Sequence, residues 1–135
     1  MTYQDLINNI QREIAVLDGS MGVWMQQKGM PTGVCPEAWY MENPSVVEDA
    51  LAQYVAAGSS VIYTPTLGAN PVKLREYGLA KDSRSINTEL AALSRRAADG
   101  RALVAGDISM TGEYVEPFGE LSFEDAVRCF AEQIE

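Results

Sequence analysis

Two patterns of hydrophobic and polar positions alternate along this chain. Short apolar runs stand at residues 14–17, 60–64 and 102–105, and the first of them, IAVL, is typical of a strand covered on both faces. Between these runs lie longer segments, over residues 44–57 and 83–99, whose apolar side chains recur at helical spacing. Strands separated by helices predict an α/β fold with parallel strands, here as three consecutive strand-and-helix units.

Residues that favour turns and helix ends set the expected boundaries of the first half. A helix near Tyr3–Glu13 precedes the first strand, Ile14–Leu17, and an irregular stretch rich in glycine and proline follows over residues 22–44. Pro44 then begins a helix that ends near Gly58. The second strand starts at Ser60, and its regular part ends near Thr64 because the following proline has no N–H to donate.

The second half is predicted in the same way. Residues 67–79 read as a loop and a short helix, and a longer helix over Ser83–Asp99 ends at Gly100. The third strand is Ala102–Ala105. The spacing of Ser122 and Asp125 is a capping pattern that begins a final helix.

All three predicted strands end in small or polar residues, in the segments DGSMG (18–22), TPTLGAN (64–70) and GDISMTG (106–112). In parallel α/β folds the ligand site lies beyond the carboxyl ends of the strands. The sequence therefore predicts a ligand site that includes Asp18. The alternative is a tight turn in which Asp18 caps its own backbone.

Composition limits the possible functions. The chain has 135 residues, of which 47% are hydrophobic, so it is one domain at most and can form a core. With 19 acidic and 10 basic residues its net charge is −9, which argues against nucleic acid as a partner. No apolar run approaches the roughly 20 residues that span a bilayer, and the polar N-terminus is unlike a signal peptide, so no membrane partner is expected.

Cysteine and histidine content adds two restrictions. Cys35 and Cys129 lie far apart in sequence and form neither a disulfide framework nor a metal knuckle, which favours a cytoplasmic location. The chain contains no histidine, which excludes Ser–His or Cys–His catalysis and histidine-ligated metal within these residues.

Several motifs in a fixed order carry a family resemblance: LDGSMG (17–22), CPE (35–37), YVAAGSSVIYTPTLGAN (54–70), YGL (77–79), IN (86–87), AGDISMTGEYVEPFGELSFEDAV (105–127) and FAEQ (130–133). The chain resembles the N-terminal part of the homocysteine S-methyltransferase family, which includes the homocysteine-binding domain of cobalamin-dependent methionine synthase and betaine–homocysteine methyltransferase. The resemblance implies a (β/α)8 TIM barrel of roughly 300 residues. Residues 1–135 would supply only its first three βα units, an incomplete barrel.

The resemblance also implies a substrate site. The loop formed by Asp18, Gly19, Ser20 and Met21 is expected to hold homocysteine, with the N–H groups of Ser20 and Met21 receiving its carboxylate. Asp18 would fix the loop or the polar end of the substrate. Glu37 is expected to orient this first loop, and the other expected residues line the same mouth: Thr66, Asn70 and Asp107. For these last four, a satisfied turn or cap is the equally weighted alternative.

The chemistry implied by the family is methyl transfer to homocysteine sulfur, held by zinc on cysteine thiolates. Those cysteines belong to motifs beyond residue 135, and neither Cys35 nor Cys129 matches them. The family acid that receives the substrate amino group also lies beyond residue 135. The chain alone is therefore expected to hold no metal and no catalytic residue and to be inactive. A corrinoid is expected only through a partner domain or protein.

Departures from the family pattern leave the acceptor open. The chain has TPTL where the family often has TNTF, so Pro65 and Leu67 change the second strand end. Such changes fit a divergent branch that methylates or demethylates another small molecule and passes methyl groups to or from a corrinoid protein.

Two other interpretations remain. A non-catalytic binding or assembly module would associate through uncovered strand edges, with the remainder of the barrel or with another copy of itself. An unrelated flavodoxin-type domain is the weaker alternative, because the chain lacks a GxGxxG phosphate loop.

Overall fold

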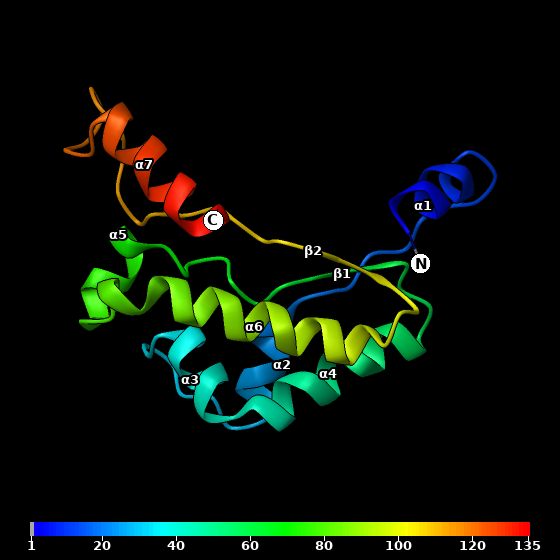
Figure 1. Ribbon diagram of the computed structural model, residues 1–135. Coiled ribbons are helices and arrows are strands. Elements are labelled where there is room, and N and C mark those ends of the chain that lie inside the picture. Colours follow the sequence, from blue (N-terminus) through cyan, green and yellow to red (C-terminus); the bar gives the residue numbers. More distant parts are fainter. Residues whose placement is uncertain (1) are drawn as a thin grey trace.

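The computed structural model describes residues 2–135, and most of its helices lie on one side of a short parallel sheet (Figure 1). The elements in chain order are α1 (Tyr3–Ile10), α2 (Met21–Gln27), α3 (Pro36–Glu42), α4 (Pro44–Ala56), β1 (Val61–Tyr63), α5 (Pro71–Leu74), the 3₁₀ turns η1 (Arg75–Tyr77) and η2 (Ala80–Asp82), α6 (Ser83–Ala98), β2 (Leu103–Ala105) and α7 (Phe123–Ile134). The α/β prediction is confirmed, with two of the three expected strands forming a ladder.

β1 lies at the centre of the strand arrangement. It pairs in parallel with β2, in the register Val61 to Leu103, and Val61 also forms a single parallel bridge to Leu17. Two backbone hydrogen bonds hold the preceding segment in place, from Asp18 N–H to Val61 O (3.1 Å) and from Ser60 N–H to Val16 O (2.7 Å). The order across the sheet is therefore residues 14–17, β1, β2.

The prediction that Ile14–Leu17 is a strand covered on both faces was wrong. Ile14 is 91% exposed, and Val16 and Leu17 are about half exposed. A single bridge at Leu17 pairs this segment with β1. No further strand among residues 2–135 lies along its other edge, so its side chains stay exposed. The apolar side chains of this segment are of a kind that is usually buried, but no part of the described chain covers them.

The hydrophobic core fills the space between the sheet and the helical layer of α2, α3, α4 and α6. Leu51 of α4, Ile62 of β1 and Leu90 of α6 have almost no exposed surface. Figure 1 shows α4 and α6 side by side beneath the strands. On the outer surface the Arg96 guanidinium donates two hydrogen bonds to Glu48 Oε2, at 3.1 and 3.0 Å, and so joins the same two helices.

The predicted long helices are confirmed as α4, α6 and α7. After α6 the chain enters the left-handed region at Asp99 (φ 49°) and Gly100 (φ 68°), which ends the helix as expected. At the start of α7 the Ser122 hydroxyl accepts a hydrogen bond from Asp125 N–H (3.0 Å). The first helix, α1, ends three residues before the predicted Glu13.

The expected irregular stretch, residues 22–44, was predicted incompletely. It contains most of α2 and all of α3, each seven residues long. Pro36 is the first residue of α3, a position where the missing N–H of proline costs no hydrogen bond, and α2 ends before Gly29. Glycine and proline therefore limit the length of these helices and do not prevent them.

Candidate functional site

The loop that follows Leu17 is fastened to β1 by Asp18. Its backbone N–H donates to Val61 O, and its carboxylate Oδ2 accepts a hydrogen bond from Tyr63 N–H (3.0 Å). Asp18 thus connects the end of the 14–17 segment to both Val61 and Tyr63 of β1. Asp18 is a turn residue of the loop and also a residue of the cavity described below.

Gly19 allows the close approach of Tyr54, and a side chain here would displace the Tyr54 ring. A Cβ at position 19 would lie 2.9 Å from Tyr54 Oη, nearer than side chains tolerate. The same hydroxyl donates to Ser20 O (3.3 Å), and the Tyr54 ring packs edge-on against Trp24 at a centroid distance of 5.1 Å. The loop therefore rests on an aromatic pair contributed by α4 and α2.

Two consecutive backbone donors of this loop have no acceptor within residues 2–135. Ser20 is the residue before α2, and its side chain makes no capping hydrogen bond. No described group accepts from the N–H of Ser20 or of Met21. Adjacent free N–H groups in a loop form a concavity that binds anions, and a carboxylate is such an anion.

A cavity of about 410 Å³ lies against this loop and the strand ends. Six of the eight predicted site residues line it: Asp18, Gly19, Ser20, Met21, Glu37 and Asp107. Tyr40 and Tyr63 also line it, and the sequence analysis missed both. The signals were present, since Tyr40 lies one helical turn after Glu37 and Tyr63 is the last residue of β1.

Glu37 is a buried carboxylate that joins the start of α3 to the loop after β1. It is 5% exposed, and its Oε1 accepts from Gly68 N–H (2.8 Å), while Oε2 accepts from Cys35 Sγ (3.5 Å). The structure thus places Glu37 against the loop after β1, not the first loop that it was predicted to orient. Burial raises the pKa of Tyr40 to about 12, and the negative charge of Glu37 adds to this effect.

Two further carboxyl groups on the cavity wall ionise less readily than usual. Burial raises the pKa of Asp107, and it also raises the pKa of Asp18, where the nearby charge of Asp107 adds to the shift. The hydrogen bond from Tyr63 N–H opposes part of the shift at Asp18. A bound cation or hydrogen-bond donor would therefore be favoured beside these two carboxylates.

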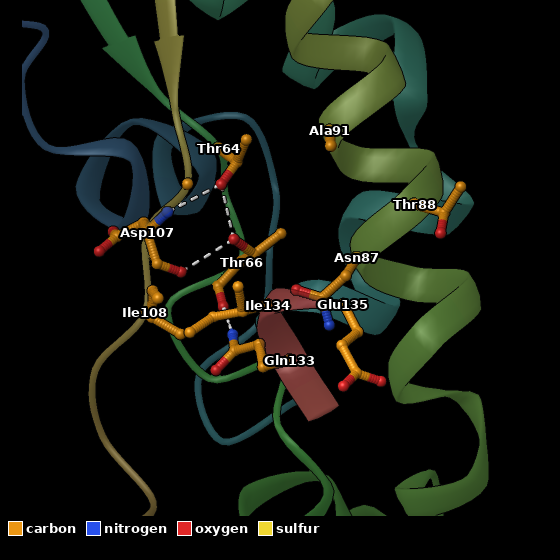
Figure 2. A pocket seen from close by; sticks show the side chains of 11 residues that line it. Thr64, Thr66, Asn87, Thr88, Ala91, Asp107, Ile108, Gln133, Ile134 and Glu135 are labelled. Atoms are coloured by element: carbon orange, nitrogen blue, oxygen red, sulfur yellow. Dashed lines mark hydrogen bonds between the residues drawn. The ribbon is translucent and has the colours of Figure 1, made fainter. Parts of the chain in front are cut away.

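The structure does not bring Thr66 and Asn70 into this cavity. Thr66 lines a neighbouring cavity, where its hydroxyl donates to Asp107 O at 2.9 Å (Figure 2). Asn70 is fully buried: its Oδ1 accepts from Lys73 N–H (2.9 Å) and its Nδ2 donates to Met110 O (2.9 Å). Asn70 therefore acts as the cap of α5, which was the alternative interpretation of this residue.

Comparison with known proteins identifies the family of this chain. The sequence profile of the family described as "Homocysteine S-methyltransferase" matches residues 15–135. The chain belongs to this family. Methionine synthase of Mycobacterium tuberculosis is 30% identical over 101 residues, which are 70% of this chain and 8% of that protein. Betaine–homocysteine S-methyltransferase 1 of Pongo abelii is 30% identical over 129 residues, 91% of this chain and 31% of that protein.

Solved structures support the fold. The homocysteine methyltransferase MmuM from Escherichia coli, in its oxidized form, superposes with a TM-score of 0.67 at 22% identity. The match covers 79% of this chain and 41% of that one. The α/β arrangement seen here is therefore part of a larger fold in MmuM, and this chain spans under half the length of the relatives named here.

The two cysteines of this chain, Cys35 and Cys129, do not fit a zinc site. Cys35 donates to Glu37 and Cys129 donates to Asn70 Oδ1 (3.3 Å), and burial raises the pKa of both thiols, which disfavours the thiolate that binds metal. Within residues 2–135 no three Cys, Asp or Glu side chains come together as metal ligands. In the same described part, no helix has the length and apolar character to cross a membrane.

Proposed function

We propose that this chain contributes the substrate-carboxylate loop of a homocysteine methyltransferase barrel. In this proposal residues 1–135 are the N-terminal three βα units of the barrel, which transfers a methyl group to or from a thiol or corrinoid acceptor. The observation that supports it is the pair of free N–H groups of Ser20 and Met21, on the wall of a cavity at the strand ends. Membership of the family makes homocysteine the expected ligand.

The two ends of amino acids such as homocysteine suit the two sides of this cavity. The carboxylate would accept hydrogen bonds from Ser20 and Met21 N–H, since consecutive main-chain donors suit a carboxylate oxygen. The ammonium group would lie toward Asp18 and Asp107, where a cation offsets the charge of two partly buried carboxylates. Glu37 acts indirectly, because it holds Gly68 and with it the Pro65–Leu67 wall of the cavity.

This assignment covers binding and orientation of the substrate. Since neither Cys35 nor Cys129 fits zinc, no step of sulfur activation is assigned to these residues. The remainder of the barrel would supply the metal ligands and the methyl donor site, and the chain alone would be inactive.

The experiment removes the N–H donor of Met21 and controls separately for the loss of its side chain. Met21→Pro deletes the N–H at the first position of α2, where proline is tolerated, and Ser20 already has the extended backbone (ψ 113°) that a residue before proline needs. Met21→Ala is the matched control, because it removes the side chain and keeps the donor. Binding of L-homocysteine and of 3-aminopropane-1-thiol, which lacks the carboxylate, is measured by calorimetry.

We expect Met21→Pro to weaken L-homocysteine binding by about tenfold or more, the cost of losing a hydrogen bond to a charged group. Met21→Ala should bind L-homocysteine within a few-fold of the unaltered chain, and the thiol without a carboxylate should bind both variants alike. Equal affinity of the unaltered chain for the two ligands would refute the carboxylate role.

A second candidate function, a non-catalytic assembly module, is favoured by the exposed apolar segment 14–17. Such an edge can pair with the rest of a barrel or with another copy of the chain. Val16→Lys places a charge on this edge without removing the hydrogen bond that Val16 O accepts from Ser60. If assembly is the function, the variant should dissociate a complex that light scattering detects for the unaltered chain. A monomer in both cases would exclude self-assembly.

A further inference from the structure

Tyr40 of α3 carries a hydroxyl that no group of the described chain binds. The residue is 5% exposed and packs in the hydrophobic core, yet its hydroxyl forms no hydrogen bond within residues 2–135. The oxygen keeps some accessible surface, because Gln133 Oε1 is the only fully covered side-chain N or O atom of the described residues that lacks a partner. A tyrosine hydroxyl in a protein interior normally has a partner, so this one is available to a bound molecule.

The other buried hydroxyls of the described chain are all used. The buried serine and threonine side chains each form a hydrogen bond within residues 2–135: Ser59, Thr64, Thr66, Ser83, Ser94 and Thr111. The hydroxyl of Tyr54, in the same helical layer as Tyr40, donates to Ser20 O. The free hydroxyl is therefore a particular feature of Tyr40.

Two cavities touch Tyr40, and the neighbouring charges indicate which of them its hydroxyl faces. One is the cavity of about 410 Å³ that includes Glu37, and the other, of about 170 Å³, is lined by Glu89 and Arg96 of α6. A long side chain of a helix leans toward the helix N-terminus, which for Tyr40 is the end of α3 where Glu37 lies. Burial raises the pKa of Tyr40, and the charges that add to this shift are those of Glu37 and Cys35, not those of Glu89 and Arg96. The hydroxyl thus faces the larger cavity.

In that cavity the Tyr40 hydroxyl is a hydrogen-bond donor on an apolar wall. Its pKa is raised to about 12, so the phenol keeps its proton at neutral pH. The wall near it includes Pro36, Pro65 and Leu67. A single donor among apolar groups favours a ligand atom that accepts a hydrogen bond and is attached to apolar carbon.

We propose that Tyr40 Oη donates a hydrogen bond to the sulfur of a thiol amino acid bound in this cavity. The inference rests on the proposed function, in which the N–H groups of Ser20 and Met21 receive the carboxylate. An ammonium group has no lone pair with which to accept, so sulfur is the acceptor that remains. Sulfur accepts weakly as a thiol and more strongly as a thiolate, and its methylene neighbours suit the apolar wall. Tyr40 is therefore a specificity residue for the sulfur end of the ligand.

The test measures by calorimetry how the unaltered full chain and Tyr40→Phe bind three ligands. These are L-homocysteine, L-2-aminobutyrate, which lacks the sulfur, and 3-aminopropane-1-thiol, which lacks the carboxylate. Tyr40→Phe should weaken binding of both sulfur compounds by about three- to tenfold, the value of one hydrogen bond, and leave L-2-aminobutyrate unchanged. Unchanged affinity for all three, or a loss for L-2-aminobutyrate with none for the aminothiol, would overturn the proposal.

Urea unfolding of the same variant separates a binding role from a structural one. Because the hydroxyl has no partner in the described chain, Tyr40→Phe should not lower the unfolding midpoint. The matched control is Tyr114→Phe, at a 78% exposed position outside the cavity, which should change neither the midpoint nor any affinity. A lowered midpoint in Tyr40→Phe, together with an equal loss for all three ligands, would make Tyr40 a packing residue and overturn the proposal.

The unaltered chain tells the two possible failures apart. If it binds L-homocysteine no better than 3-aminopropane-1-thiol, the carboxylate loop of the proposed function is wrong. If it binds L-homocysteine no better than L-2-aminobutyrate, the sulfur contact of Tyr40 is wrong, and this comparison needs no variant.

Discussion

The helical side and the strand side of this molecule differ in how well they bury their own apolar residues. Side chains of α2, α3, α4 and α6 form one continuous core against β1, with Leu51 and Leu90 almost completely buried. On the strand side, Ile14, Val16 and Leu17 stay half to nearly fully exposed. The helical layer is therefore complete within these residues, whereas the strands present surface that further structure would cover. The candidate site lies at the border of the two.

The largest effect is expected where the core is complete. Leu51→Ala leaves a void between α4 and the sheet and should lower the free energy of unfolding by about 2–5 kcal/mol. Leu17→Ala, the matched change on the strand side, should lower it by under about 1 kcal/mol, because that side chain is already half exposed. Urea unfolding followed by circular dichroism measures both. Equal losses would show that the two sides are not different.

A smaller loss of stability is expected at Glu37, which lies where the helical side meets the strand side. Glu37→Leu leaves the buried Gly68 N–H without its acceptor and should cost about 1–3 kcal/mol. Glu37→Gln keeps an oxygen for this N–H and should cost clearly less. The same unfolding measurement compares them, and a Gln variant as unstable as the Leu variant would show that the charge, not the hydrogen bond, matters.

The smallest effect concerns the partly buried carboxyl of Asp107. Its pKa is raised in the folded chain, so the folded state holds the proton more tightly, and the stability from this group falls as the pH rises from the ordinary value through the raised one. Asp107→Asn should therefore raise the free energy of unfolding at neutral pH by under about 1 kcal/mol, and this gain should vanish near about pH 3. A gain that persists at low pH would mean that the cause is not ionisation.

Features decided by neighbouring residues were predicted well from sequence. Pro44 and Gly58 bounded α4, and Ser122 with Asp125 marked the start of α7, because caps and turns depend on local backbone chemistry. The apolar run 14–17 was predicted to be a covered strand. Covering it requires other elements on both of its faces, and the sequence of the run does not show whether they are present.

The same difference between local and long-range contacts is seen among the residues of the candidate site. The loop Asp18–Met21 and Asp107 line one cavity, because the ends of parallel strands meet on one side. Asn70 follows the same rule in sequence, yet its side chain turns inward to cap α5. The partner of Glu37 is Gly68, which is 31 residues away, and a contact of that range depends on how the elements pack.

The central claim is that Ser20 and Met21 N–H groups receive a substrate carboxylate, and amide resonances report on it most directly. In a titration of the ¹⁵N-labelled chain, L-homocysteine should move the Ser20 and Met21 resonances to lower field, as hydrogen bonds to a carboxylate do. 3-Aminopropane-1-thiol should leave these two resonances in place. If L-homocysteine saturates the chain without moving them, or if both ligands move them equally, the loop is not a carboxylate site.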